Sequence, residues 1–198
     1  MVELSYTTKS TKNGEAYLCG QLLIAMPGMT DPRFEKSIIY ICAHNEEGAM
    51  GLVLNRPIVS MSFAEMLKQL GIDAGDSGGA IRVLFGGPIE ESRGFVLHSP
   101  DYLQDASMIV DDNVALTATV DILRAIADGT GPRKRVLALG YAGWGPGQLD
   151  SEILHNGWLS VGADDDLVFG GDLNAKWGRA MAKIGIDPLM LSDDAGHA

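Results

Sequence analysis

The chain has 198 residues, of which 46% are hydrophobic and 21% are charged, and it carries a formal net charge of -11. This length and composition fit one globular domain and exclude a largely disordered chain. The negative charge would repel the phosphates of a nucleic acid, so we expect no direct nucleic-acid binding. We interpret residues 1–198 as a single domain and expect loose order only at 1–13 and 192–198.

The N-terminal segment gives no sign of secretion or membrane insertion. Residues 1–13 are polar and rich in Thr and Lys, whereas a signal peptide needs an apolar centre. No apolar run approaches the ~20 residues of a membrane-spanning helix. Cys19 and Cys42 lie in apolar runs, where free thiols act as small buried hydrophobes. We therefore expect a cytoplasmic protein with no membrane partner.

Apolar runs predict the strands. Residues 17–26 form a nearly continuous apolar run that ends at Pro27-Gly28, as a buried strand does. The β-rich runs 37–43 and 49–54 are joined by a short connection that contains Gly48, which predicts an antiparallel hairpin. Further strands are predicted at 81–85, 94–98, 136–141 and 167–169, with a polar turn over 90–93.

Capping residues and helical spacing predict the helices. Ser62 and Glu65 form a capping-box pattern for a helix that continues to Leu70. Residues 111–113 offer N-cap oxygens for a second helix, in which the apolar residues between 116 and 127 fall at helical spacing. Two further helices are predicted, one beginning near 146–147 and one over 173–184.

The order of these elements predicts the fold class. Strands that arrive in hairpins, with helices inserted irregularly, indicate an α+β fold and not a doubly wound parallel sheet. Glycine in or beside a strand is typical of a bulge, a corner or a close backbone approach. Six glycines lie in or beside the predicted strands: Gly20, Gly51, Gly86, Gly87, Gly94 and Gly140. We therefore predict a strongly bent, mainly antiparallel sheet that forms a pseudo-barrel with helices packed around it.

Several distinctive blocks follow one another along the chain, namely residues 20–27, Asn55-Arg56-Pro57, Phe85-Gly86-Gly87-Pro88 and the Gly-Trp-Gly segment 143–145. Together these blocks resemble the YqgE/AlgH family over residues 14–198. The resemblance implies an α+β fold with a bent, pseudo-barrel sheet. It also carries the label of transcriptional regulator, which fits poorly with a charge of -11 and the lack of a basic helix-turn-helix pattern. We expect any regulatory role to be indirect.

Asn55 and Arg56 are candidate ligand-binding residues because they leave a predicted strand just before Pro57. A guanidinium presents five donors, which suit a carboxylate or a phosphate. The alternative is that Arg56 pairs within the chain with Asp31, Glu65 or Glu152 and holds loops together.

The segment around Trp144 is a second candidate surface. Gln148 and Glu152 are four residues apart and share one face of the predicted helix, next to the large indole of Trp144. This group could hold a ligand or a peptide. The alternative is that Trp144 and Trp158 belong to the core, with Gln148 and Glu152 satisfying neighbouring backbone donors.

Histidines at strand ends raise the question of catalysis. His44 and His98 could act with Glu152 as the acid and base of a small-molecule hydrolase. However, no Ser or Cys lies in a nucleophile motif, and the spacing of His44, His98, His155 and His197 is unlike that of metal ligands. We assign no catalytic residue, metal or cofactor, and keep His44 as a binding candidate.

These observations favour a non-catalytic binding or indirect regulatory domain for a small molecule or a protein partner. The hydrolase is one alternative. Another is an assembly protein whose acidic surface, suggested by Asp164-Asp165-Asp166, docks a basic partner. The basic cluster Arg133-Lys134-Arg135 is interpreted as the solvated start of a strand.

Overall fold

The computed structural model describes residues 17–75, 81–187 and 190. The segments 1–13 and 192–198, for which loose order is expected, lie outside these residues. The strands are β1 (Gln21–Ala25), β2 (Ile38–Asn45), β3 (Gly48–Val53), β4 (Val83–Phe85), β5 (Ile89–His98), β6 (Met108–Ile109), β7 (Ala115–Thr117), β8 (Arg135–Trp144) and β9 (Trp158–Gly162). The helices are α1 (Phe63–Gln69), α2 (Val120–Ala127), α3 (Gln148–Leu154), α4 (Asp165–Phe169) and α5 (Lys176–Lys183).

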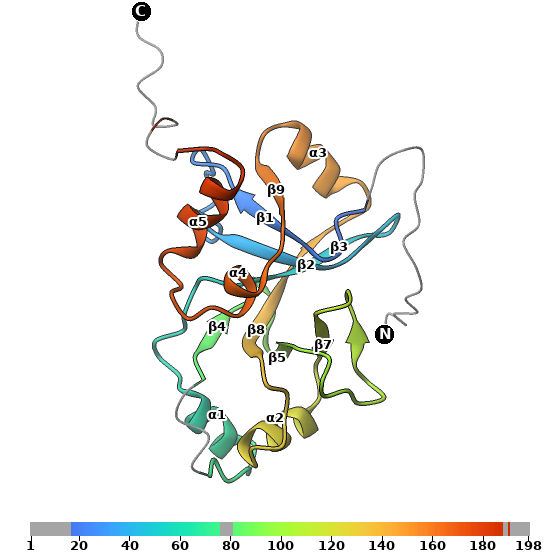
Figure 1. The fold of residues 1–198 in the computed structure, drawn as a ribbon, viewed down its shortest axis with the longest axis vertical. Helices are drawn as coiled ribbons and strands as arrows, with labels where there is room; N and C mark the ends of the chain where they lie inside the picture. The colour runs from blue at the N-terminus through green and yellow to red at the C-terminus, as the bar shows by residue number, and fades with distance from the viewer. Residues whose placement is uncertain (1–16, 76–80, 188–189, 191–198) are drawn as a thin grey trace, which may run out of the picture.

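The strands form one curled sheet with the order β6-β7-β5-β8-β3-β2-β1-β9. Neighbours on this path are antiparallel, whereas β4 lies off the path and pairs with β8 in parallel. Figure 1 shows the resulting half-barrel, with α1 and α2 at one end and α3 at the other. The prediction of an α+β fold with a strongly bent, mainly antiparallel sheet is confirmed.

Strand β8 connects the two halves of the sheet. Its first half pairs with both β4 and β5, so Leu137 lies between Val83 and Val96. Its second half pairs with β3 at Ala49–Gly51. The strand changes neighbours at Gly140, whose φ of +70° is open to glycine but strained for other residues.

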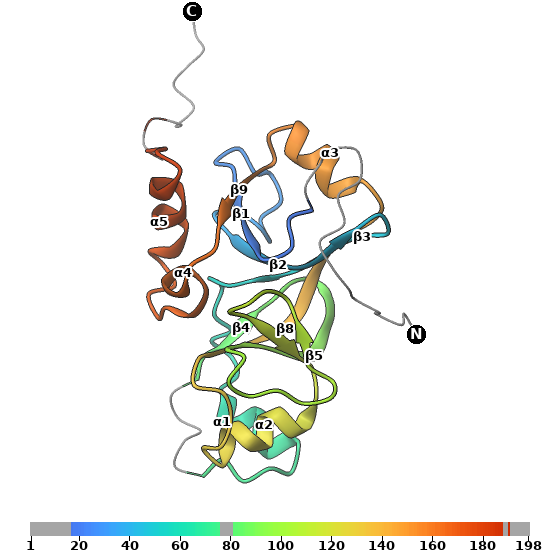
Figure 2. The same cartoon turned by 45° about the vertical axis from the view of Figure 1, so that its right-hand side comes forward.

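Three groups of buried side chains form the core. The largest lies inside the curl and includes Leu22, Tyr40 and Leu97. A second, built around Trp144 and Trp158, lies next to α3, and a third is covered by α1 and α2. Figure 2 shows α5 alongside β9 and β1, and its residues Ala180 and Met181 belong to the first group. The helices therefore cover the sheet at its two ends and along one side.

Two local predictions are confirmed in detail. The runs 37–43 and 49–54 form the hairpin β2–β3, which contains a register shift between Ile41 and Ala43. Ser62 caps α1, since its hydroxyl accepts a hydrogen bond from Glu65 N and the Glu65 carboxylate accepts one from Ser62 N. Glycine-containing connections and capping boxes carry their own local signal, so they can be identified without tertiary context.

Other predictions were wrong. The second helix begins at Val120 and not at 111–113, because Leu116 pairs with Leu97 in the sheet and Asp111 accepts a hydrogen bond from Tyr40 Oη. Residues 167–169, predicted as a strand, end α4, whose start is capped by Asp164. The polar turn predicted over 90–93 belongs to β5. Strand β9 was missed, as were the short strands β6 and β7.

Replacing Gly140 with Ala should destabilise the protein strongly. A Cβ at this position would lie 2.3 Å from the carbonyl oxygen of Gly87, and the positive φ adds backbone strain. We expect Gly140→Ala to lower the free energy of unfolding by about 2–4 kcal/mol, measured by urea unfolding. Gly178→Ala is the control, because a Cβ in the helix α5 meets nothing within 4 Å and should stabilise by about 0.5–1 kcal/mol. Equal effects of the two substitutions would contradict this account of Gly140.

Candidate functional site

The carboxylate of Glu152 is the centre of the cluster around Trp144. Its Oε2 accepts hydrogen bonds from the indole Nε1 of Trp144 at 2.9 Å and of Trp158 at 2.8 Å. Its Oε1 accepts from Gln148 Nε2 at 2.9 Å, while Gln148 Oε1 accepts from Gly145 N at 2.9 Å. The two indole rings meet edge to face with their centroids 6.0 Å apart. The structure therefore brings Trp144, Gln148 and Glu152 together, as predicted.

The polar atoms of this cluster already bind one another. Trp144 is 7% exposed and Trp158 is 2% exposed, and Phe34 packs edge to face on Trp158. Two buried indole N–H groups need an acceptor, and Glu152 provides it from the next helix. The cluster thus joins the end of β8, α3 and the start of β9. These contacts agree with the alternative in which Trp144 and Trp158 belong to the core. Glu152 accepts hydrogen bonds from indole donors, however, where that alternative expected backbone donors.

Asn55 and Arg56 bind the backbone of the segment before β2. Asn55 Oδ1 accepts from Ile38 N at 3.0 Å, and its Nδ2 donates to Lys36 O at 2.8 Å. Arg56 Nη2 donates to Glu35 O at 2.8 Å. Arg56 also lies near enough to Asp31 to help lower the pKa of that carboxyl, behind the larger effect of Arg33. Both side chains therefore hold the turn that leads into β2.

His44 is held in one tautomer at the end of β2. Its Nδ1 accepts a hydrogen bond from Leu18 N at 3.1 Å, so the proton lies on Nε2, which is 3.7 Å from Asp150 Oδ1. The side chain is 4% exposed. Burial lowers the pKa of His44, and the negative charge of Asp150 opposes this shift only in part. His44 is thus a neutral, buried side chain next to α3.

His98 belongs to a different set of contacts. Its Nδ1 lies 2.9 Å from Ser99 O and its Nε2 lies 2.8 Å from Thr117 Oγ1, which is 2.7 Å from Ser107 Oγ. Burial lowers the pKa of His98, and the Ser99 carbonyl opposes this effect. Among the described residues, no hydrogen bond or ion pair joins His44, His98 and Glu152. The hydrolase alternative gains no support from these contacts.

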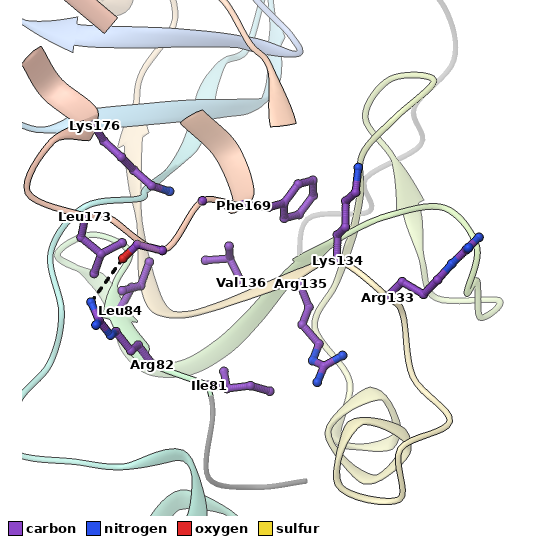
Figure 3. Close-up of a pocket in the computed structure, with 12 residues that line it drawn as sticks. Ile81, Arg82, Leu84, Arg133, Lys134, Arg135, Val136, Phe169, Leu173 and Lys176 are labelled. Carbon is purple, nitrogen blue, oxygen red and sulfur yellow. Dashed lines mark hydrogen bonds between the residues drawn. The ribbon is translucent and has the colours of Figure 1, made fainter. Parts of the chain in front are cut away.

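A pocket of about 500 Å³ lies elsewhere, between the start of β8, the start of β4 and the connection from α4 to α5 (Figure 3). Its apolar lining consists of Ile81, Leu84, Val136, Phe169 and Leu173. Gly170 and Gly171 also line the pocket. The rest of the lining is basic and consists of Arg82, Arg133, Lys134, Arg135 and Lys176, so we call it the basic pocket. None of the described residues that line it is Asp or Glu.

Two of the five cations are already paired with carboxylates. Arg133, which extends away from the pocket in Figure 3, lies 3.3 Å from Asp101 through its Nε, and Lys134 pairs with Asp165. The other three cations have no carboxylate within 4.0 Å among the described residues, and each donates to a backbone carbonyl. Arg82 donates to Gly171 O, Arg135 donates to Pro132 O, and Lys176 donates to Val168 O. The pocket therefore holds a surplus of positive charge within an acidic protein.

Arg135 and Lys176 carry polar atoms that the fold leaves incompletely satisfied. Arg135 Nε is buried and has no hydrogen-bond partner. Lys176 is 1% exposed, and its Nζ donates to Val168 O at 2.9 Å. Burial lowers the pKa of Lys176 to about 8, although Asp166 opposes the shift. An unpaired donor and a buried amine are both unfavourable for the fold alone.

The acidic run beside the pocket is neutralised by cations of the same chain. Asp164 caps α4 and lies 2.7 Å from Lys183 Nζ, while Asp166 pairs with Arg179 at 2.8 Å. Asp165 is the partner of Lys134. These pairs reduce the surface charge available to a basic partner, so the assembly alternative gains no support here.

Sequence analysis missed this pocket and interpreted residues 133–135 as a solvated strand start. That holds for Arg133, which is exposed, but Arg135 is half-buried and begins β8. The available signal was a Lys within the apolar spacing of the last helix, since Lys176 precedes the core residues Ala180 and Met181 by about one turn. A metal site is not indicated either, as the described residues contain no group of three His, Cys, Asp or Glu side chains placed to hold an ion.

Removing the carboxylate of Glu152 should destabilise the Trp cluster. We expect Glu152→Leu to lower the free energy of unfolding by about 2–4 kcal/mol, because two buried indole N–H groups lose their acceptor. Urea unfolding followed by circular dichroism measures this change. Ser151→Ala, at an exposed position of the same helix, should change it by less than about 0.5 kcal/mol. A Glu152→Leu protein as stable as the wild type would rule out the structural role of this carboxylate.

Lys176→Met should stabilise the free protein. The amine is buried in its protonated form at pH 7, and an apolar side chain of similar length removes that cost, so we expect a gain of about 1–2 kcal/mol. The gain should shrink above pH 8, because the wild-type amine is then neutral in the folded state while the unfolded chain still binds the proton. Urea unfolding at pH 7 and pH 9.5 tests both points. Lys183→Met, which loses the pair with Asp164, is the control and should not stabilise. A loss of stability in Lys176→Met would be the contrary result.

No helix in the described part of the chain is both long and apolar enough to cross a membrane.

Comparison with known proteins shows what the chain resembles. A UPF0301 protein of Afipia carboxidovorans is 58% identical over 198 residues, covering 96% of this chain and 94% of its own length. A UPF0301 protein of Rhodospirillum rubrum is 55% identical over 184 residues, covering 93% and 96%.

Solved structures agree with these relatives. The solution structure of the AlgH protein from Pseudomonas aeruginosa has a TM-score of 0.77 and 39% identity, covering 96% of this chain and 100% of that one. A crystal structure of a Corynebacterium diphtheriae protein shares the fold, with a TM-score of 0.71 and 19% identity over 92% of this chain and 94% of that one. The family model described as AlgH-like matches residues 22–189. The chain therefore belongs to the AlgH-like family.

Proposed function

We propose that this protein is a non-catalytic binding domain that holds a small anionic molecule in the basic pocket and takes part in regulation indirectly. The observation that carries the proposal is a group of three basic side chains that line this pocket without a carboxylate partner among the described residues: Arg82, Arg135 and Lys176. Lys176 is buried and Arg135 is half-buried. A cation held away from water without a counter-charge disfavours the folded state unless a bound anion compensates it.

The location of the charge supports this choice over the Trp cluster. The protein as a whole carries a charge of -11, so a local excess of cations is contrary to its average composition. In the Trp cluster, by contrast, both oxygens of Glu152 already accept hydrogen bonds within the chain. An incoming ligand would have to displace those bonds there, whereas donors are available in the basic pocket.

A cytoplasmic setting is part of the proposal. Cys19 and Cys42 are both free, and burial raises the pKa of the Cys42 thiol far above its ordinary value. Unreactive free thiols are common in a reducing compartment. The proposal involves no metal or cofactor and no direct contact with nucleic acid.

Thermal shift and calorimetry with sulfate, citrate and phenyl phosphate test the proposal, with chloride at matched ionic strength as the reference. We expect at least one of the three anions to stabilise the wild-type protein through 1:1 binding. Arg82→Gln should weaken that binding by about 10-fold, since a charge-assisted hydrogen bond is lost.

Arg93→Gln is the matched control, because Arg93 is an exposed arginine paired with Glu90 outside the pocket. It should bind the anion as the wild type does. The proposal fails if none of the three anions binds, or if Arg82→Gln and Arg93→Gln reduce the affinity equally.

A further inference from the structure

We propose that His44 is an acid-sensitive latch for residues 17–19, which we call the arm. The neutral ring of His44 holds the arm on the end of β2, and protonation of the ring releases the arm and uncovers apolar surface beside Trp144. None of these residues lines the basic pocket, so the latch is separate from the anion-binding function proposed above.

Two contacts of His44 hold the arm in place. The ring nitrogen Nδ1 accepts a hydrogen bond from Leu18 N at 3.1 Å. The ring of Tyr17 meets the imidazole edge to face, with the two centroids 5.1 Å apart. Leu18 is half-buried, and its side chain packs against the second core group, which contains Trp144. The closed arm therefore covers part of this core group.

Protonation of His44 is incompatible with the hydrogen bond to Leu18. A neutral imidazole has one donor nitrogen and one acceptor nitrogen, whereas both nitrogens of an imidazolium are donors. In the protonated ring, Nδ1–H would face the N–H of Leu18 with no acceptor between them. Turning the ring by half a rotation gives no acceptor either, because it places a C–H group toward Leu18. The arm must therefore move away from a protonated ring.

The contacts that follow the arm limit how far it can open. Gly20 N donates to Ile41 O at 2.9 Å, and this bond contains no group that titrates between pH 5 and pH 7. Within the arm, the Cys19 thiol donates to Cys42 O at 3.2 Å, but a thiol is a weak donor. Gly20 has a φ of +79°, so the chain turns sharply there. We therefore expect the opening to end at Gly20 and β1 to keep its pairing with β2.

The charges around the ring set the direction of the effect. Burial lowers the pKa of His44, and Asp150 on α3, which lies 3.7 Å from Nε2, opposes this effect in part. Strand β3, which pairs with β2, carries no charged side chain. The other charged or titratable groups near the ring are Glu152 on α3, Glu46 and Glu47 in the β2–β3 turn, and Tyr17 and Cys19 on the arm.

The lowered pKa makes the latch sensitive to acid. When the arm leaves, the ring gains access to water and its pKa returns toward the ordinary value of about 6.5. The closed latch thus binds a proton more weakly than the open latch. Closure is fully favoured above pH ~6.5 and is lost as the pH falls through the lower pKa of the closed state.

Hydrogen exchange of the Leu18 amide, measured by NMR between pH 7 and pH 5, tests the latch. We expect the protection factor of this amide to fall by at least about 3-fold over the range, because the opening equilibrium takes up a proton. The amide of Ala25 is the internal control, since it donates to Ser37 O at 3.0 Å and this acceptor does not titrate. Its protection factor should stay constant.

Two variants of His44 separate the proton from the contact. His44→Gln offers a neutral oxygen acceptor that does not titrate, so protection of Leu18 should no longer depend on pH. His44→Phe has no acceptor, so protection should be low at every pH. His155→Gln is the matched control, because His155 is an exposed histidine whose Nδ1 lies 2.7 Å from Ser151 O within α3. This variant should behave as the wild type does.

Fluorescence of a dye that binds apolar surface tests the consequence of release. We expect it to increase from pH 7 to pH 5 in the wild type and in His155→Gln, but not in His44→Gln. An equal increase in His44→Gln would overturn the uncovering of apolar surface. The latch itself is overturned if Leu18 protection is the same at pH 7 and pH 5, if it falls in parallel with that of Ala25, or if His44→Gln keeps the pH dependence.

Discussion

The course of β8 is the constraint on which the rest of the structure depends. One strand pairs with β4 and β5 in its first half and with β3 in its second, so the two halves of the sheet share a single backbone segment. The change of neighbours occurs at Gly140, where the Gly87 carbonyl approaches too closely for any side chain. The start of the strand carries Arg135 into the basic pocket, while its end carries Trp144 to Glu152. The geometry of both clusters therefore follows from the bend in this strand.

The two clusters differ in whether their buried donors have acceptors within the chain. At the end of β8, a carboxylate from α3 satisfies two buried indole donors, and the contacts within the chain are complete. At its start, Arg135 Nε has no acceptor and Lys176 is buried with one carbonyl partner. Folding alone would favour apolar residues at the second place. This cost in stability is the reason for proposing that an anion binds there.

Sequence reasoning succeeded where the signal is local. The Ser62 capping box and the β2–β3 hairpin are specified by residues a few positions apart, and the order of the predicted elements indicated the α+β class that the YqgE/AlgH resemblance also implies. Sequence reasoning failed where contacts with distant segments determine the conformation. Leu116 fits a helical spacing, yet pairing with Leu97 makes it part of β7. Residues 167–169 have a β-rich composition, yet the Asp164 cap starts a helix before them. Short segments have weak preferences, so their neighbours in the fold determine their conformation.

The same distinction explains why sequence reasoning identified the cluster at the end of β8 and did not identify the pocket at its start. Trp144, Gln148 and Glu152 are close in the chain, so their proximity could be predicted from helical geometry. Arg82, Arg135 and Lys176 come from segments about 40–50 residues apart, and only the parallel pairing of β4 with β8 and the position of α4 and α5 bring them together. Conspicuous residue types mark what a chain needs in order to fold, and Glu152 serves that need. What marks a ligand site is a group left unsatisfied after folding, and that property appears only when every partner within the chain has been identified.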